Sequence, residues 1–384
     1  MIKISRIKKN LEKFTFPRLS GTEFELKAFN KAKQEVEDLN LEFEVQRFTF
    51  STFYSRIYPK ISFLSITLIL LIFYINIFEI MSLVLVIILF SILIISVLLT
   101  RQPEKIQFIS KLNSQNLLVK IKSISKDIKN KDRIVLFISH LDSKGQRFRI
   151  KTRIRIIKFW FYTSIILPAI IILKILILGF KMMFYVIGLF PLIMNMLASI
   201  LIILNNTDNS SDGAVDNASG IVCNLEMLNH YNIPENRLTN YNMWFLFTGA
   251  EECGTMGIRN FYNNLENFDL DKSIAFDFES ITNYIFLFPG GKERDHAKDI
   301  NYLLLNNNRN LVIKNHSTKR IFGTHSDGGF LGDRGFQGYG IGGAGAHTYM
   351  HTSNDTIDKI NAPILKRLCL VLTDVLKEHD SKFV

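Results

Sequence analysis

Histidine and acidic residues lie at five separate points of this 384-residue sequence, each next to a short apolar or helix-like run. They are His140 and Asp142 in "HLDS", Asp216 in "GAVDNASG", Glu251 and Glu252 in "GAEECG", Asp277 in "AFDF", and His351 in "MHTSNDT". Imidazole nitrogens and carboxylate oxygens are the ligands that zinc and similar divalent metals take from proteins. If the fold brings these residues together, they can form a metal site.

The segments around these residues predict how they come together. "RIVLFISH", "NMWFLFTG" and "SIAFDF" are short apolar runs typical of strands, whereas "GIVCNLEMLNHY" and "GIRNFYNNLE" have helical periodicity. Alternating strands and helices predict an α/β sandwich with a largely parallel or mixed central sheet. Sites in such sheets form at the carboxyl ends of the strands, so we expect the candidate ligands to meet at one edge.

Taken singly, these residues also have simpler interpretations. Asp216 could cap the helix that follows it, and His351 could belong to a capping cluster. The pair Glu251 and Glu252 could be solvated surface. This pair, however, follows a strongly apolar strand, where unpaired charge is costly unless it binds a metal. The joint pattern therefore favours metal binding.

Two long apolar blocks explain why 48% hydrophobic residues coexist with a net charge of +11. Each block, 61–100 and 156–204, has the length of two membrane spans of about 20 residues. We therefore predict four transmembrane helices in two hairpins that turn near Asn76 and Gly179. The remaining segments would form the α/β domain: 1–60, 101–155 and 205–384.

Basic residues predict the orientation of these spans. From Lys144 to Lys158 there are seven Lys or Arg and no acid, whereas the hairpin turns contain Glu79 and Lys181. The positive-inside rule then places the α/β domain in the cytoplasm. We expect Lys174, near the end of its span, to extend to the membrane interface. Three scattered cysteines fit a reducing compartment.

The stretch "RFRIKTRIRI" (147–156) alternates basic and apolar residues with period two. One face would be basic and suited to lie along anionic head groups. The net positive charge therefore indicates anionic lipid as a partner, and no nucleic-acid-binding module supports the other option. Because this stretch closely follows His140, we expect the mouth of the site to lie near the bilayer surface.

Six motifs occur in a fixed order: "HLDS", "GAVDNASG", "GAEECGTMGIRNF", "FDF", "HSDGGF" and "HTSNDTID". Together they resemble the co-catalytic zinc aminopeptidases of peptidase family M28, over essentially all of the chain outside the apolar blocks. The spacings from Asp216 to Glu251 and Asp277 fit that family. Only the interval from His140 to Asp216 is too long, and the second hairpin occupies the excess. The resemblance thus implies an aminopeptidase-like sandwich interrupted by two transmembrane hairpins.

Carried over to this sequence, the resemblance implies two zinc ions, with cobalt or manganese as substitutes, and a role for each residue. Asp216 would bridge the ions and be followed by a cis peptide bond. The other ligands would be His140 and Asp277 for one ion and Glu252 and His351 for the other. Asp142 would orient the His140 imidazole, and Glu251 would be the general base.

Two departures from the family pattern concern the donor that stabilises the oxyanion. The family's "SDH" region has a His where this chain has Gly328, and some members have a Tyr where this chain has Gly323. Nearby candidates for substrate or oxyanion contact are Thr324, His325, Ser326 and Asp327. We interpret the Gly-rich "GYGIGGAGAH" (338–347) as a flexible rim of the substrate pocket, because it lacks the features of a phosphate-binding loop.

The function implied by the resemblance is a membrane-embedded zinc aminopeptidase that hydrolyses N-terminal peptide bonds. One alternative is an aminoacyl transferase of the glutaminyl-cyclase type with a single zinc. Others are a non-catalytic scaffold of the same fold, or a transporter, although the predicted spans are nearly featureless. The substrate would be a peptide, and the sequence leaves the oligomeric state open.

Overall fold

The chain divides into two compact units in the computed structural model, which describes residues 2–75, 79–106, 109–125, 133–265, 268–290, 295–307, 311–316 and 326–383. The α/β unit comprises Met1–Phe50, Leu112–Gly145 and Asp208–Val384. The helical unit comprises Ser51–Lys111 and Gln146–Thr207, and so begins earlier and ends later than the predicted hairpins at both insertions. Asn76, expected in the first turn, lies outside the described residues.

A mixed eight-stranded sheet forms the centre of the α/β unit, in the order β1-β2-β6-β3-β7-β10-β8-β9. Strands β6, β3, β7 and β10 run parallel to one another, whereas β2 and β8 pair antiparallel with β6 and β10. This topology confirms the predicted fold class. The strands are β1 (Phe43–Ser51), β2 (Lys111–Ile121), β3 (Ile134–His140), β6 (Asn242–Thr248), β7 (Ile274–Glu279), β8 (Ile285–Gly290), β9 (Ile313–Asn315) and β10 (Gln337–Gly343), with a separate two-stranded sheet of β4 (Gly145–Gln146) and β5 (Thr207–Asp208).

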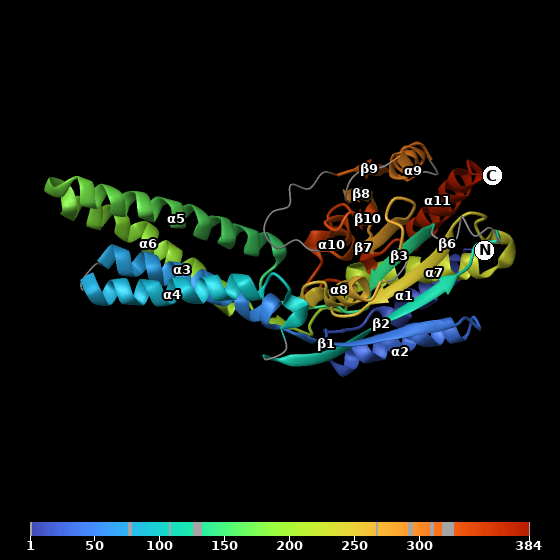
Figure 1. The fold of residues 1–384 in the computed structure, drawn as a ribbon, viewed down its shortest axis with the longest axis horizontal. Coiled ribbons are helices and arrows are strands. Elements are labelled where there is room, and N and C mark those ends of the chain that lie inside the picture. Colours follow the sequence, from blue (N-terminus) through green and yellow to red (C-terminus); the bar gives the residue numbers. More distant parts are fainter. Residues whose placement is uncertain are drawn as a thin grey trace. The chain divides into compact units, whose positions relative to one another are not determined.

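Helices cover both faces of the sheet (Figure 1). Alternate residues of β3 belong to two different cores, because side chains along a strand point to opposite faces. Val135 and Phe137 pack in the core of α1, α2, α7, α9 and α11, whereas Leu136 and Ile138 pack with α8 and α10. The helices are α1 (Ile4–Phe14), α2 (Glu23–Glu37), α7 (Ser219–Asn232), α8 (Met256–Asn263), α9 (Asp295–Asn306), α10 (Asp327–Gly332) and α11 (Ala362–Ser381).

The Gly-rich segment 338–347 is not the flexible rim that we predicted. Its first part forms β10, which pairs with both β7 and β8. Gly338 has a φ of +151°, and a Cβ there would lie 1.9 Å from the Ala275 carbonyl oxygen. Glycine therefore allows a close backbone approach that no other residue permits, and strand pairing overrides the low strand propensity of glycine.

The helical unit consists of α3 (Tyr58–Ile75), α4 (Glu79–Leu99), α5 (Ile150–Leu176) and α6 (Lys181–Leu204). Among the described residues, four helices are long and apolar enough to cross a membrane: Phe53–Ile75, Ile80–Leu99, Ile150–Leu176 and Lys181–Leu204. The prediction of a period-two basic face at 147–156 is wrong, because α5 begins at Ile150. Arg and Lys are good helix formers, so this basic stretch continues into the apolar helix without a break.

The helices of this unit are less featureless than predicted. Asn195 of α6 is fully buried, accepts a hydrogen bond from Thr67 of α3 (2.6 Å) and donates to Thr163 of α5 (2.8 Å). Lys174 is only 6% exposed and donates to the Tyr74 carbonyl (2.7 Å). Its ammonium therefore binds the carbonyl end of α3, a site that favours cations.

Candidate metal centre

Sheet register explains why the candidate residues meet. His140 ends β3, Thr248 ends β6, and these two residues are paired in the parallel ladder. Parallel strands place their carboxyl ends at the same edge, so the Glu251–Glu252 turn after β6 lies beside His140. Asp216 comes from the turn before α7, and His351 from the loop before α11.

The first ligand group contains His140, Asp216 and Glu279, whose ligand atoms lie within 4.8 Å of one another. His140 Nε2 is 3.2 Å from Asp216 Oδ1 and 3.7 Å from Glu279 Oε2. Both His140 and Asp216 are buried.

The second ligand group contains Asp216, Glu252 and His351. His351 Nε2 is 3.2 Å from Asp216 Oδ2 and 3.1 Å from Glu252 Oε1. Asp216 therefore presents Oδ1 to one group and Oδ2 to the other, the arrangement expected of a carboxylate that bridges two ions.

Asp277, the predicted partner of His140, belongs to neither group, and the first group contains Glu279 instead. Asp277 pairs with Ile138 in the β3–β7 ladder, two residues before His140, so Glu279 is the acid level with His140. The Asp277 carboxylate instead accepts a hydrogen bond from the Gly328 amide (2.6 Å). A Cβ at residue 328 would lie 2.7 Å from Asp277 Cβ, which explains the glycine at this departure from the family pattern.

The donor atoms of the two groups fit divalent cations. His140 Nε2, Glu252 Oε1 and Glu279 Oε1 are buried and make no hydrogen bond within the described chain. Buried polar atoms are costly without partners, and His140 Nε2 and Glu252 Oε1 face the cluster of imidazoles and carboxylates. His140 Nδ1 lies 3.0 Å from the Asp142 carbonyl, which leaves the Nε2 lone pair directed at the cluster when Nδ1 carries the proton.

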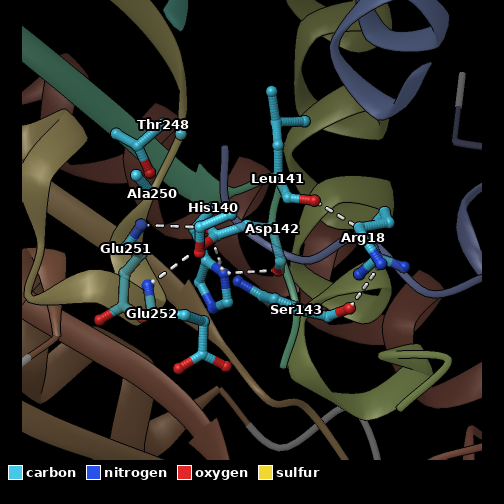
Figure 2. Close-up of polar contacts among 12 residues, drawn as sticks. Arg18, His140, Leu141, Asp142, Ser143, Thr248, Ala250, Glu251 and Glu252 are labelled. Atoms are coloured by element: carbon cyan, nitrogen blue, oxygen red, sulfur yellow. Dashed lines mark hydrogen bonds and ion pairs between the residues drawn. The ribbon is translucent and has the colours of Figure 1, made fainter. Parts of the chain in front are cut away.

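Asp142 does more than orient the imidazole. Its carboxylate accepts hydrogen bonds from the backbone amides of Glu251 (3.1 Å) and Glu252 (3.0 Å), as Figure 2 shows. The Asp142 Oδ1 atom lies 3.5 Å from His140 Nδ1, whereas the Asp142 backbone carbonyl oxygen lies 3.0 Å from the same nitrogen. Asp142 therefore fixes the turn that carries the predicted base and a predicted ligand, besides holding His140.

Glu251 lies beside the ligand groups and is a member of neither. It is 7% exposed, and burial raises the pKa of its carboxyl well above the ordinary value. The preceding residue, Ala250, has a φ of +52°, and its amide donates to the buried carboxyl of Glu25 (2.7 Å). Left-handed non-glycine residues persist where their surroundings fix them, often at functional sites.

Opposite charges set the ionisation of the cluster. Burial disfavours the Asp216 anion, but the adjacent His140 and His351 imidazoles outweigh it and hold the pKa of Asp216 well below its usual range. Burial acts likewise on Glu252, yet His351 and Lys144 lower its pKa to about 2. Lys144 Nζ lies 2.6 Å from Glu252 Oε2, a contact that our motif reasoning missed.

The turn that carries Asp216 is held from the other side by Asp355. The Asp355 carboxylate accepts hydrogen bonds from the Val215 and Asp216 amides. The peptide bond between Asp216 and Asn217 is cis, as the resemblance implied. Asp355 therefore supports the backbone of the bridging residue.

The candidates for oxyanion contact divide into two pairs. Thr324 and His325 lie outside the described residues, as does Gly323. Ser326 caps α10 by accepting a hydrogen bond from the Gly329 amide (3.1 Å). Asp327 is buried and accepts a hydrogen bond from the Thr248 hydroxyl. Ser326 and Asp327 therefore already have partners within the fold.

Comparisons with known proteins concern the family and the fold of the chain. The model of Peptidase family M28 matches residues 189–376, whereas no curated protein sequence matches the chain. The solved aminopeptidase from Aneurinibacillus sp. strain AM-1 aligns with a TM-score of 0.59 and 11% identity over 98% of this chain and 94% of that chain. BSAP, a zinc aminopeptidase from Bacillus subtilis, aligns with a TM-score of 0.56 and 12% identity over 98% of this chain and 95% of that chain.

Glutaminyl cyclases share the same fold. The enzyme from Tannerella forsythia aligns with a TM-score of 0.54 and 13% identity over 98% of this chain and 99% of that chain. At such identities the likeness shows the fold, and the family comes from the matched sequence model. Residues 189–376 therefore match peptidase family M28, as the motifs predicted, and the chain shares the fold of solved zinc aminopeptidases.

Proposed function

We propose that the chain is a membrane-embedded, zinc-dependent aminopeptidase that removes N-terminal residues from peptides. One observation carries this proposal: the two oxygens of Asp216 face two different ligand groups, and Glu251 lies beside both without joining either. A bridging carboxylate with a free carboxylate next to it suits hydrolysis by a dinuclear centre.

The chain's own residues would divide the work as follows. Zinc ions held by His140, Asp216 and Glu279 and by Asp216, Glu252 and His351 would lower the pKa of a shared water and polarise the scissile carbonyl. Glu251 would accept the proton of the attacking water and deliver it to the leaving amine. Asp142 would keep the Glu251 backbone in place during both transfers.

The raised pKa of Glu251 suits this role. A carboxyl buried among other acids holds a proton more tightly than a solvated one, so it can return the proton to an amine. Glu251 must be ionised to begin the cycle, so activity should fall as the pH drops through its pKa.

The direct test is hydrolysis of amino-acid p-nitroanilides by the detergent-purified full chain. We expect wild type to cleave them with two zinc ions bound, and Glu251→Ala and Asp216→Ala to be inactive. Activity that survives both substitutions would refute the site.

A glutaminyl-cyclase-like aminoacyl transferase is the second candidate. Asp216, Glu252 and His351 alone form a complete three-ligand group, and cyclases are among the structural neighbours. One zinc per chain, with cyclisation of an N-terminal glutamine peptide, would favour this candidate. Two zinc ions would favour the aminopeptidase, and an inactive protein without metal would indicate a scaffold.

The membrane assignment and the cytoplasmic orientation belong to the same proposal. Its support is the four apolar helices and the basic residues that flank them. The three cysteines are buried, so single cysteines at exposed positions can report topology. An impermeant maleimide should label Met182→Cys in intact cells and Asn354→Cys only after permeabilisation; the reverse pattern would overturn the orientation. The proposed partners are peptide substrates and anionic lipid, with no nucleic acid.

A further inference from the structure

The second helical hairpin interrupts the chain between two ligands of the first group. The α/β unit ends at Gly145 and resumes at Asp208, so His140 lies before the insertion and Asp216 after it. Something must hold the two flanking segments in register. A buried arginine from a third segment contacts both.

Arg18 is fully buried. All the hydrogen bonds described for its guanidinium go to backbone carbonyls. Before the insertion, Nε donates to the Leu141 carbonyl (2.8 Å). After the insertion, Nη1 donates to Asp212 (2.9 Å) and Nη2 to Gly213 (2.9 Å). The remaining acceptors are Phe14 and Phe16 of its own segment. Figure 2 shows the guanidinium beside the His140–Ser143 segment.

Backbone contacts strengthen the same three-segment junction. The Arg18 amide donates to Ser143 Oγ (3.0 Å), and the Ser143 amide donates to the Arg18 carbonyl (3.0 Å). Ser143 Oγ in turn lies 3.3 Å from the Ser211 carbonyl, to which it can donate. A Cβ at Gly213 would lie 2.8 Å from Arg18 Nη2, so the close packing leaves no room for a side chain there.

The guanidinium is suited to this junction in a way that an ammonium is not. Its donors form a rigid, planar fork that reaches acceptors in several directions, whereas a lysine presents three donors from one point. Leu141 lies between His140 and Asp142, and Gly213 lies three residues before Asp216. Fixing these two carbonyls therefore fixes the origins of two ligand loops.

We propose that Arg18 is a positioning residue. It holds together the two segments that flank the second hairpin, and so sets the separation of His140 and Asp216. None of the hydrogen bonds described for its guanidinium goes to a ligand side chain, so it would act through the two backbones. This inference rests on the metal centre proposed above. Loss of a residue that hydrogen-bonds a metal ligand directly typically changes metal affinity about 10–100-fold, and we use this range as the expected effect for Arg18.

The test compares Arg18→Met and Arg18→Lys with Arg6→Met in the full-length protein. Arg6 is a matched control because it pairs with the buried Glu226 in the same unit, and neither residue belongs to a ligand loop. The readouts are zinc stoichiometry, zinc affinity, and the rise in Tm that zinc causes. We expect wild type and Arg6→Met to bind two zinc ions alike. Arg18→Met should lose one ion or bind it about 10–100-fold more weakly, and Arg18→Lys should show the same loss.

Guanidinium rescue provides the second measurement. Added guanidinium should restore zinc binding to Arg18→Ala but not alter Arg6→Ala. Two results would overturn the positioning role. The first is a wild-type zinc affinity in Arg18→Lys. The second is rescue in which guanidinium raises the Tm of zinc-free Arg18→Ala but leaves its zinc affinity low, and both results can be obtained even if Arg18→Met does not fold. A wild-type protein that binds no zinc would instead refute the proposed function.

Discussion

The α/β unit and the helical unit both bury clusters of polar side chains, but the two clusters differ in whether their polar atoms are hydrogen-bonded. Around Asn195 in the helical unit, neutral groups satisfy one another: Thr67, Trp160, Thr163, Ser164 and Ser199 all hydrogen-bond within the cluster. At the sheet edge of the α/β unit, His140, Glu252 and Glu279 leave buried atoms without a hydrogen bond among the described residues.

This difference separates packing from chemistry. A satisfied neutral network specifies how helices pack and needs nothing further. Convergent buried carboxylates and imidazoles with unused atoms are costly unless a ligand completes them. Substitutions in the first cluster should therefore change stability alone, and substitutions in the second should change metal binding and turnover.

The largest effect is expected from Glu251→Gln. The substitution keeps the shape of the side chain but removes the base, so kcat should fall about 10²–10⁴-fold. Zinc content should stay at the wild-type value because Glu251 lies outside both ligand groups. Steady-state kinetics and metal analysis on one preparation check both statements. A loss of zinc together with activity would show that Glu251 is a ligand, and would remove the proposed division of roles.

Glu279→Gln and Asp277→Asn sharpen the comparison within the site. If Glu279 is the ligand level with His140, Glu279→Gln should reduce the zinc content from two ions per chain to one. Asp277→Asn should retain two ions, because its carboxylate is engaged by the Gly328 amide. Metal analysis after dialysis against low zinc distinguishes them. The opposite outcome would restore the assignment that the sequence motif suggested.

Glu25→Gln should change how stability depends on pH. Burial, and then the nearby Asp142, raise the pKa of Glu25 to about 8 from 4.5. The folded protein then keeps this proton while the unfolded chain loses it, so stability falls as the pH rises from about 4.5 to 8. The free energy of unfolding should fall by at most about 1.4 kcal/mol per pH unit because of this one group.

Tm measured across this pH range in detergent gives the test. Glu25→Gln should reduce the decline that wild type shows. Glu35→Gln, which removes a partly exposed carboxylate from the same helix, serves as the control. Equal slopes for wild type and Glu25→Gln would contradict the protonated state of Glu25.

The smallest effect is expected in the helical unit. Asn195→Leu removes hydrogen bonds to two other helices, α3 and α5, and should lower stability by about 1 kcal/mol, since such bonds between membrane helices are individually weak. The kcat of the folded fraction should not change. Ile193→Leu, on an exposed part of the same helix, is the control. A fall in kcat with Asn195→Leu at constant folded fraction would break the separation between the two clusters.

Several features of the fold could be predicted from the sequence because they depend on local patterns. Apolar runs of strand length and helical periodicity predict the alternating α/β order, and the segments so identified overlap the observed β3, β6, β7 and α7. Four uninterrupted apolar helices follow from composition alone. Short-range patterns failed where pairing partners decide: residues 337–343 form a strand despite their glycines, and 150–156 form a helix despite their alternation.

For the site, the residue types that could bind metal follow from the sequence, and the positions at which they meet do not. The motif directs attention to Asp277, but the register of β7 against β3 brings Glu279 level with His140. Glu279 carried a signal in the sequence, since residues two apart on a strand share a face.

Only the tertiary structure shows what holds the ligands in place. Arg18, Glu25 and Asp355 are far in the sequence from the loops that they contact, and no local pattern links them. The sequence determined a metal-binding chemistry and an apolar helical insertion, because both follow from residue type and short-range order. The tertiary structure decided that Glu279 lies level with His140 and that Arg18 contacts both segments flanking the insertion, because both depend on strand register and on contacts between distant segments.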